Sequence, residues 1–530
     1  MRYSIFIIII LFSLFTFSCA KRGSITGGLK DTIPPTLRQS LPANYSTDFK
    51  GNIIKLNFDE YVKLKDVNKQ LIISPPMERA PIITPSTASK TISIRIVDTL
   101  KANTTYSLNF GQSIQDNNEA NPFPQFKYVF STGSYIDSLS LSGRIKDAYS
   151  KTADNYVSVM LYEVDEDYTD SIIYKKPPRY ITNTLDSARV WQLENLKAGK
   201  YLLVALKDLN NNNKYNSKSE KIAFQKEFIT IPNDTLFELE LFNEALPLKT
   251  LVPSQVAAGR ILMGYEGNSK DIAVKLFNNS DEISSVVSKV PDSDSLQIWF
   301  PNIKADSLLL KVSKGEFASE YNVKLRAMKK DTLSFKPSVS GVLPLRETFK
   351  INSNIPISAI NSDLISITNK DSTAVNFKTS YDDFLQNIVL DFIREPEQKY
   401  NIKVLPGGLK TFYDQVNDTL SYKLNTKRLS DYGNLRVTLE NVRKFPIIVE
   451  LTDAKGTVRA RMFSDKETVL NFDSIDPSIY TLRLIYDDNG NQEWDAGNYL
   501  EKRQSEQVIY YPTSIDVRAN WDWEQTFTLP

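Results

Sequence analysis

The chain has 530 residues, which is too long for a single hydrophobic core and predicts roughly three to five domains. Its 64 basic and 63 acidic residues leave a net charge of +1, which argues against a nucleic acid as partner because phosphate binding needs a basic excess. The sequence has no histidine and a single cysteine, which excludes His-based catalysis, an internal disulfide, and a His- or Cys-rich metal site.

The N-terminus predicts a signal peptide at residues 1–18. Met1-Arg2-Tyr3 is a short, positively charged start, and the stretch from Ile5 to Phe17 is almost wholly apolar. That stretch is too short to cross a bilayer as a mature helix and has the length of a signal-peptide core. Ser18 is small, and the only cysteine, Cys19, follows at once.

The junction Thr16-Phe17-Ser18-Cys19 resembles a bacterial lipoprotein signal of the Bacteroidetes type, although the commonest pattern has Leu where this chain has Thr16. The resemblance implies cleavage before Cys19 and acylation of that residue, which would anchor the protein to a membrane. An ordinary secretory signal that happens to contain a cysteine is the alternative. Ala20, together with the lack of an acidic cluster after it, implies the outer membrane, with the periplasmic leaflet favoured over the cell surface. Residues 19–33 predict a flexible tether.

From residue 34 onward the pattern is that of β-strands. Apolar and polar residues alternate over short runs, which clusters of Asn, Asp, Gly and Pro separate. This predicts an all-β chain, a multidomain string of antiparallel β-sandwiches after the signal peptide. The clearest strand candidates are Ile53–Phe58, Thr91–Ile96, Thr105–Phe110, Ser158–Tyr162 and Tyr201–Leu206.

Five segments near the start of the chain occur in combination: Asp31-Thr32-Ile33-Pro34-Pro35, Phe58-Asp59-Glu60, Asn103-Thr104-Thr105-Tyr106, Asp116-Asn117-Asn118-Glu119-Ala120-Asn121 and Phe130-Ser131-Thr132-Gly133. With these segments the first domain, residues 34–135, resembles a bacterial Ig-like domain of the SbsA type. Ala120 departs from that pattern, which usually has Gly at this turn position. The resemblance implies an Ig-like sandwich with no catalytic activity.

The second domain, residues 136–246, resembles a transthyretin-like or carboxypeptidase-regulatory-like sandwich. The resemblance rests on the approach Leu196-x-x-Gly199-x-Tyr201 to a core strand. This unit recurs at residues 431–530, because Tyr480 follows Tyr201 and Asp487 follows Asp208 at the same interval of 279 residues. The family is not enzymatic, so the resemblance again implies no catalytic activity.

The middle of the chain completes the predicted layout. Residues 345–430 predict a divergent repeat of the Ig-like domain, since Lys350-Ile351-Asn352 and Tyr400 match Lys55-Leu56-Asn57 and Tyr106 when gaps are allowed. Residues 247–344 are rich in strands, match neither unit, and predict a β-rich linker domain.

Two loops place oxygen-bearing side chains at alternating positions, the spacing that calcium prefers. The better candidate consists of Asp487, Asn489, Asn491, Glu493 and Asp495; the poorer one consists of Asp208, Asn210, Asn212 and Asn216, with Lys214 in the ligand register. Neither has the Gly and Glu that an EF-hand loop needs. A polar hairpin turn is the favoured explanation of both loops, because Asn, Asp and Gly are the natural turn residues.

Two acidic groups are the candidates for a carboxylate-only hydrolase. One is Asp59-Glu60, and the other is Glu163 with Asp165, Glu166 and Asp167 on a predicted hairpin. Carboxylates on a turn are ordinarily solvated, so we expect no enzyme. Trp191 is expected in a core. Trp521 and Trp523 should share one face of the last strand, with core or interdomain packing expected over an exposed pair that stacks on a sugar.

The sequence therefore predicts a non-enzymatic, lipid-anchored outer-membrane protein that acts as a structural or protein-interaction scaffold of the cell envelope. Its partner would be an envelope protein or a polysaccharide. The alternative is a surface carbohydrate-binding or adhesion protein, which predicts solvent-exposed aromatic side chains on a domain face.

Overall fold

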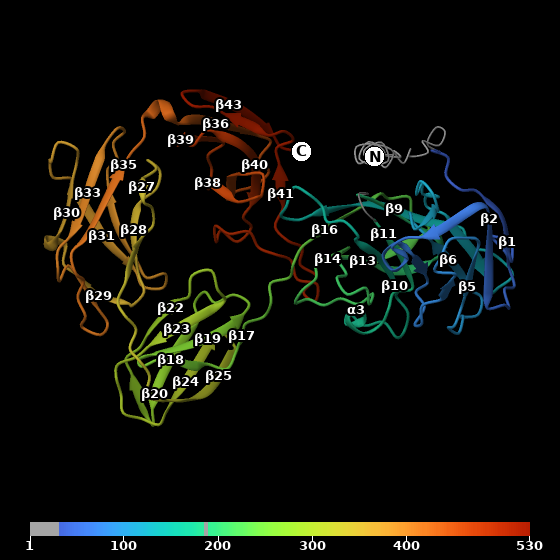
Figure 1. Ribbon diagram of the computed structural model, residues 1–530, viewed down its shortest axis with the longest axis horizontal. Coiled ribbons are helices and arrows are strands. Elements are labelled where there is room, and N and C mark those ends of the chain that lie inside the picture. The colour runs from blue at the N-terminus through green and yellow to red at the C-terminus, as the bar shows by residue number, and fades with distance from the viewer. Residues whose placement is uncertain (1–30, 185–188) are drawn as a thin grey trace, which may run out of the picture. The chain divides into compact units, whose positions relative to one another are not determined.

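The computed structural model describes residues 31–184 and 189–530, so the predicted signal peptide, Cys19 and most of the tether lie outside the described residues. The described residues form two compact units. The first holds the residues up to Ser140 with two short later segments, and the second holds most of the rest. Nearly all regular structure is strand (Figure 1), which confirms the all-β prediction. Within the described ranges, no helix is both long enough and apolar enough to cross a membrane.

The first unit contains a β-sandwich whose two sheets enclose one core. One sheet has the order β1-β2-β5-β4, with β7 on β2, and the other has the order β3-β6-β8. Alternate residues of β2 and β5, such as Ile54, Leu56 and Ile92, are buried between the sheets. The elements are β1 (Leu37–Leu41), β2 (Ile53–Leu64), α2 (Val67–Gln70), β3 (Ile72–Ser74), β4 (Ile82–Thr84), β5 (Ser89–Arg95), β6 (Thr105–Asn109), β7 (Ile114–Asp116) and β8 (Lys127–Ser131).

The turn after β7 explains one of the segments that carried the Ig-like resemblance. The buried carboxylate of Asp116 accepts hydrogen bonds from the backbone N–H of Glu119, Ala120 and Asn121 at 2.7, 3.1 and 2.7 Å. Ala120 has φ +65°, a left-handed conformation that favours Gly. The turn keeps its conformation without Gly because one side chain holds three of its amides.

A second sandwich, here called the β9–β16 sandwich, follows the first. One sheet has the order β11-β10-β13-β14, with β15 on β13, and the other has the order β12-β9-β16. Trp191 is 3% exposed, which confirms its predicted place in a core. The elements are β9 (Leu139–Asp147), β10 (Ser158–Glu163), α3 (Ile172–Lys175), β11 (Tyr180–Asn183), β12 (Val190–Leu196), β13 (Gly199–Leu206), β14 (Ile222–Phe224), β15 (Ile229–Ile231) and β16 (Phe237–Leu241).

The C-terminal sandwich, here called the β36–β43 sandwich, has the same strand order. Its sheets run β38-β37-β40-β41, with β42 on β40, and β39-β36-β43. The first strand of each sandwich pairs with the last in parallel, β9 with β16 and β36 with β43, whereas β36 pairs with β39 in antiparallel orientation. The elements are β36 (Gly433–Glu440), β37 (Ile447–Thr452), β38 (Val458–Ser464), β39 (Val469–Ile475), β40 (Ser478–Tyr486), β41 (Val508–Tyr510), β42 (Ile515–Val517) and β43 (Asp522–Thr528).

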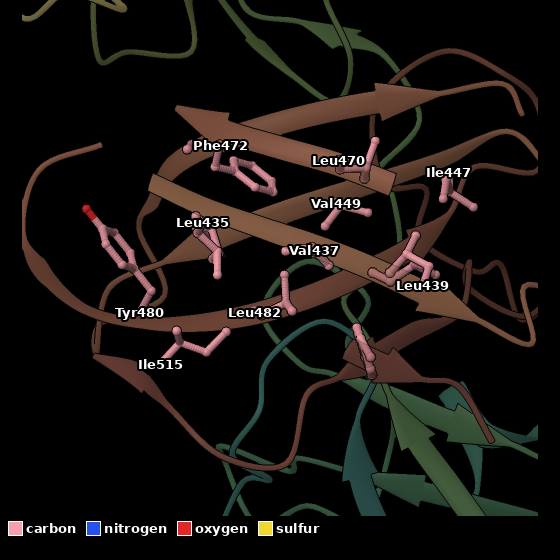
Figure 2. Packing of buried hydrophobic residues seen from close by; sticks show 14 of the residues in the cluster. Leu435, Val437, Leu439, Ile447, Val449, Leu470, Phe472, Tyr480, Leu482 and Ile515 are labelled. Carbon is pink, nitrogen blue, oxygen red and sulfur yellow. The ribbon is translucent and has the colours of Figure 1, made fainter. Parts of the chain in front are cut away.

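The core of the β36–β43 sandwich lies between its two sheets. Leu435, Val437 and Leu439 alternate along β36 on the side that faces the other sheet, from which Leu482 on β40 packs into the core (Figure 2). Phe472 on the neighbouring strand β39 lies beside its register partner Leu435 and fills the same core. Burial of each such side chain contributes about 1.5–3 kcal/mol to folding. The period-2 pattern in the sequence therefore produces both the strands and the face that each strand buries.

Residues between these two sandwiches form the β17–β25 sandwich. Its sheets run β17-β19-β23-β22, with β18 on β19, and β21-β20-β24-β25. Its elements are β17 (Lys249–Thr250), β18 (Ser254–Ala257), β19 (Arg260–Glu266), β20 (Ala273–Asn278), β21 (Asp281–Ile283), β22 (Val286–Lys289), β23 (Ser295–Trp299), β24 (Ser307–Lys314) and β25 (Phe317–Lys324).

The β26–β35 sandwich comes next, with the sheets β26-β28-β32-β31 and β27-β35-β33-β30 and the pair β29-β34. Its elements are β26 (Phe335–Pro337), β27 (Gly341–Val342), β28 (Phe349–Ser353), β29 (Ile357–Ile360), η1 (Ser362–Leu364), β30 (Ile365–Thr368), β31 (Phe377–Asp382), β32 (Asn387–Phe392), β33 (Lys399–Val404), β34 (Leu409–Thr411), β35 (Leu420–Asn425) and the short helix η2 (Leu429–Asp431) that follows it.

Candidate functional site

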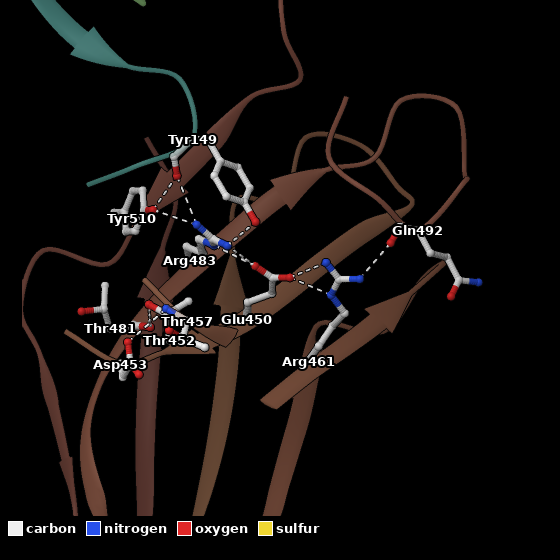
Figure 3. Close-up of polar contacts among 10 residues, drawn as sticks. All are labelled: Tyr149, Glu450, Thr452, Asp453, Thr457, Arg461, Thr481, Arg483, Gln492 and Tyr510. Carbon is white, nitrogen blue, oxygen red and sulfur yellow. Dashed lines mark hydrogen bonds and ion pairs between the residues drawn. The ribbon is translucent and has the colours of Figure 1, made fainter. Parts of the chain in front are cut away.

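A buried charge cluster lies on the outer face of one sheet in the β36–β43 sandwich. Glu450 on β37 stands directly opposite Arg461 on β38 and Arg483 on β40, so one row across the sheet holds all three side chains. The Glu450 carboxylate is fully buried, and each of its oxygens accepts from one arginine: Oε1 from Arg461 Nε at 2.6 Å and Oε2 from Arg483 Nε at 2.7 Å (Figure 3). Removing one partner of a buried pair typically costs about 3–5 kcal/mol.

Tyr149, in the loop after β9, belongs to the β9–β16 sandwich and completes the cluster. Arg483 donates to the Tyr149 phenol oxygen at 2.6 Å and to its carbonyl at 3.2 Å, and its guanidinium lies 4.0 Å from the Tyr149 ring centroid (Figure 3). Tyr510 donates to the same carbonyl at 2.6 Å. Burial lowers the pKa of Arg483, but the hydrogen bond with Tyr510 and the charge of Glu450 outweigh it and hold the pKa above its ordinary value. Arg483 therefore stays a cation that fixes Tyr149.

The cluster escaped sequence reasoning, although a signal was present. The strand Ile447–Thr452 is buried at every position, on both faces of its sheet. An ionisable residue such as Glu450 inside an apolar run marks a buried partner, because an isolated buried charge is too costly to persist. The identity of that partner was not readable, since Tyr149 lies 334 residues from Arg483.

The two predicted calcium loops have the same internal construction. In the Asp208 loop (residues 208–220), the Asp208 carboxylate accepts from the backbone N–H of Asn212 at 3.3 Å and of Asn213 at 2.8 Å. In the Asp487 loop (residues 487–506), Asp487 accepts from the backbone N–H of Asn491 at 3.1 Å and of Gln492 at 2.9 Å. Both aspartates therefore cap their own loop, as Asx turns do.

A buried glutamate closes each loop, and sequence reasoning missed both. Glu220 accepts from the N–H of Leu209 and Asn216 at 3.1 and 2.9 Å. Glu506 accepts from the N–H of Asp488 and Asp495 at 2.6 and 3.0 Å. Burial raises the pKa of each glutamate. The equivalence was hidden because the closing glutamate follows Asp208 after 12 residues but follows Asp487 after 19.

The structure brings together only part of the better calcium site. The Nδ2 atoms of Asn489 and Asn491 donate to Asp495 Oδ2 at 2.6 and 2.7 Å, whereas Glu493 is exposed. In the poorer loop the side chains of Asn210, Asn212 and Asn216 accept from the loop's own amides. Among the described residues, no group of three or more His, Cys, Asp or Glu is placed to hold a metal ion. Calcium stays a prediction for both loops.

The extra residues of the Asp487 loop contact the β9–β16 sandwich. Tyr499 is fully buried, and its ring lies 5.3 Å from that of Phe224. Lys502 forms an ion pair with Asp170 at 2.7 Å. A Cβ at Gly497 would lie 2.4 Å from the Phe242 ring, so this approach requires Gly. The loop thus adds a second contact to the one that Tyr149 makes with Arg483.

The acidic groups considered for hydrolysis do not form a paired catalytic arrangement. Asp59 accepts from the Thr36 N–H at 2.8 Å and from its hydroxyl at 2.6 Å, which lowers the pKa of Asp59. Burial and the Asp116 carboxylate raise the pKa of Glu60. The second group has exposed side chains: Glu163 ends β10, and Asp165, Glu166 and Asp167 lie on the turn that follows.

The expectation for the last two tryptophans was wrong. Trp521 is 48% exposed and Trp523 is 37% exposed, and neither belongs to a core. Their ring centroids are 6.3 Å apart with an interplanar angle of 14°, and the Arg518 guanidinium lies 5.2 Å from the Trp521 ring. Trp521 directly precedes β43 and Trp523 lies near the start of this edge strand, whereas Phe527 farther along the same strand is buried in the core.

Comparison with known proteins defines the class of the first domain. Residues 31–132 match the family model of the bacterial Ig-like domain (Big_5), which confirms the predicted Ig-like domain near the N-terminus. No curated protein matches the chain. The resemblance of other units to transthyretin-like sandwiches stays a prediction.

Several solved structures of multidomain β proteins align with much of the chain. Domains 1–6 of the surface layer protein SbsC share 12% identity over 91% of this chain and 67% of that one, with a TM-score of 0.16. The Bacillus anthracis TIE protein shares 10% identity over 95% and 76%, with a TM-score of 0.15. The I9–I11 tandem of titin shares 10% identity over 53% and 100%, with a TM-score of 0.12. Because these scores are low, no argument about function rests on the alignments.

Proposed function

We propose that this protein is a non-catalytic scaffold of the cell envelope, whose sandwiches carry interaction surfaces. The docking of Tyr149 on the Glu450–Arg483 pair carries the proposal. A catalytic carboxylate needs access to a substrate, whereas the Glu450 carboxylate is fully buried and holds two arginines. This buried charge cluster therefore serves to join two sandwiches.

The membrane location belongs to the same proposal. Cys19, at the end of an apolar segment, would carry the lipid that holds the protein in the outer membrane, in its periplasmic leaflet. We assign the β9–β16 and β36–β43 sandwiches to the transthyretin-like type, a view that their shared strand order supports. The partner would be an envelope protein or polysaccharide and not a nucleic acid, since the net charge is only +1.

Fractionation of cells tests the anchor. The Cys19→Ala variant should leave the membrane fraction, whereas Ser18→Ala, which keeps the cysteine and a small residue before it, should stay there. If Cys19→Ala still sediments with membranes, the lipid anchor is wrong. Protease treatment of intact cells tests the leaflet: protection with digestion only after lysis is expected, and loss of the protein from intact cells would place it on the surface.

The second candidate function is carbohydrate binding or adhesion at the cell surface. The exposed pair Trp521 and Trp523 favours it, because neighbouring indole rings provide a platform on which sugar rings stack. The double variant Trp521→Ala/Trp523→Ala should then lose retention on an insoluble polysaccharide. The matched control is Tyr45→Ala/Tyr135→Ala, which removes two other exposed aromatic rings and should bind as the unaltered protein does.

A further inference from the structure

A cleft of about 750 Å³ lies where the β17–β25 and β26–β35 sandwiches meet within the second unit. Lys289 and Asp292 line it from the end of β22 and the turn that follows. Lys336, Asn352 and Asn387 line it from β26, β28 and β32. Its volume is in the range of sites that bind ligands in proteins.

Contacts beside the cleft hold its two walls together. The Lys289 N–H donates to the Phe384 carbonyl at 2.8 Å, and the Phe384 side chain packs against the core of the β17–β25 sandwich. Tyr413 donates to the Gly259 carbonyl at 2.6 Å. Because both contacts join the same two sandwiches, the cleft is a formed feature rather than a chance gap between parts of the chain.

The floor of the cleft is a polar row across three strands. Lys336 is the register partner of Asn352, and Asn352 is the register partner of Asn387, so the three side chains lie on one face of the sheet. Asn352 Nδ2 donates to the Leu385 carbonyl at 3.0 Å and to Asn387 Oδ1 at 3.3 Å, so the two amides of the row are connected by a hydrogen bond.

The charged groups of the cleft have no partner among the described residues. Neither ammonium group, of Lys289 or of Lys336, takes part in an ion pair or a side-chain hydrogen bond there, and the Asp292 carboxylate likewise accepts none in that part of the chain. Two cations against one carboxylate leave the cleft positive. Many other lysines and arginines of this chain are paired, such as Lys221 with Asp147 at 2.6 Å. The cleft therefore keeps its cations available for a ligand.

We propose that this cleft binds a segment of an acidic polysaccharide. Lys289 and Lys336 bind carboxylate groups of the sugar chain, while Asp292 and the amides of Asn352 and Asn387 bind its hydroxyl groups.

The rest of the lining also suits a sugar chain. Pro291, Pro337 and Leu385 supply apolar surface for the C–H faces of the sugar rings. Asp292 disfavours a compact multivalent anion such as phosphate but accepts from hydroxyl groups. Lys336, Ser338 and Leu385 are exposed, as an extended ligand requires. The proposal does not depend on the scaffold role or on the lipid anchor.

Calorimetric titration of the purified full-length chain tests this proposal. The probe is a tetramer of galacturonic acid, and the neutral control is a tetramer of galactose. The test variant is Lys289→Gln/Lys336→Gln. The matched control is Lys324→Gln/Lys378→Gln, which removes two exposed lysines of the same two sandwiches outside the cleft.

We expect the acidic tetramer to bind and the neutral tetramer to bind at least about tenfold more weakly, a difference of about 1.4 kcal/mol. The Lys289→Gln/Lys336→Gln variant should lose at least the same factor with its unfolding midpoint unchanged, and the control variant should bind as the unaltered chain does. Affinity for the acidic tetramer should fall as salt rises. Equal binding of the two tetramers, no binding of the acidic one, or an unchanged affinity in the test variant would each overturn the proposal. Inorganic phosphate that competes at the concentration of the tetramer would also overturn it, because the cleft would then be a site for any small anion.

Discussion

Arg483 donates from Nη2 to the phenol oxygen of Tyr149 at 2.6 Å, although 334 residues separate the two in the chain. Arg483 is 1% exposed and forms an ion pair with Glu450, so its guanidinium has a charged partner on one side and the Tyr149 phenol on the other. A buried cation that loses a partner is costly. The place of the Tyr149 loop is therefore coupled to the folding of the β36–β43 sandwich.

The Tyr149→Phe variant should lower the free energy of unfolding by about 1.5–3 kcal/mol, the usual contribution of a hydrogen bond to a charged group. The ring remains, so the cation–π contact with Arg483 is kept. Urea unfolding followed by tryptophan fluorescence measures the loss, because the Trp494 ring lies 4.7 Å from that of Tyr149. The control Tyr45→Phe removes an exposed phenol and should change nothing. An unaltered midpoint in Tyr149→Phe would mean that the hydrogen bond does not contribute to stability.

The Gly497→Ala variant should destabilise the contact between the Asp487 loop and the β9–β16 sandwich by about 1–3 kcal/mol, the usual cost of overpacking. The added methyl group would lie 2.4 Å from the Phe242 ring. A double-mutant cycle with Phe242→Leu is the check, since the smaller side chain makes room for it. Gly497→Ala should cost less in that background than alone. Strictly additive effects would show that the two residues do not touch.

The hydrogen bonds from Thr36 to the Asp59 carboxylate should make the free energy of unfolding of the first unit depend on pH in the acidic range. The hydrogen bonds from Thr36 lower the pKa of Asp59 below its usual 3.8, so the unfolded chain binds this proton more readily than the folded one. The stabilisation is fully present above the unfolded pKa and is lost as the pH falls through the folded one. Urea midpoints between about pH 5 and pH 2 report it. Asp59→Asn should reduce this slope, and the exposed control Asp48→Asn should keep it.

Calcium at the Asp487 loop has a direct test. Calcium should raise the unfolding temperature above that measured with a chelator if the ion is held by Asp487, Asn489, Asn491 and Asp495. We expect a Kd of about 0.1–1 mM, as in extracellular calcium-binding modules. Asp495→Asn should abolish the shift, because Asp495 Oδ2 is the atom on which the two amides converge. Asp208→Asn, in the poorer loop, is the control and should keep it. The absence of any shift in the unaltered protein would dismiss calcium at this loop.

Local pattern was enough to find the strands. The predicted Ile53–Phe58, Ser158–Tyr162 and Tyr201–Leu206 lie within β2, β10 and β13. Ile53–Phe58 alternates because only one of its faces is buried, whereas the other two are short apolar runs that are buried on both faces. The same reasoning failed at Trp521 and Trp523. Alternation places the two on a common face, but it does not say whether another part of the chain covers that face.

Each loop shows the same division between local and distant information. The spacing of Asp208 and Asp487 after their strands marked equivalent turns, and the structure gives both the same hydrogen bonds to backbone N–H groups. The closing residues Glu220 and Glu506 were not found, because a loop of unequal length breaks the register on which a repeat search depends.

The sequence by itself determined the all-β class and the Ig-like domain near the N-terminus. It also determined, in each alternating strand, which residues face the core of the sandwich. These follow from the period of the strand and from turn chemistry, both of which act between neighbours in the chain. Only the tertiary structure decided that Tyr149 meets Arg483, that Gly497 meets Phe242, and that Lys289 and Lys336 line one cleft. Such contacts depend on which surfaces of separate sandwiches meet, and their energy comes from burial and charge pairing between residues far apart in the chain.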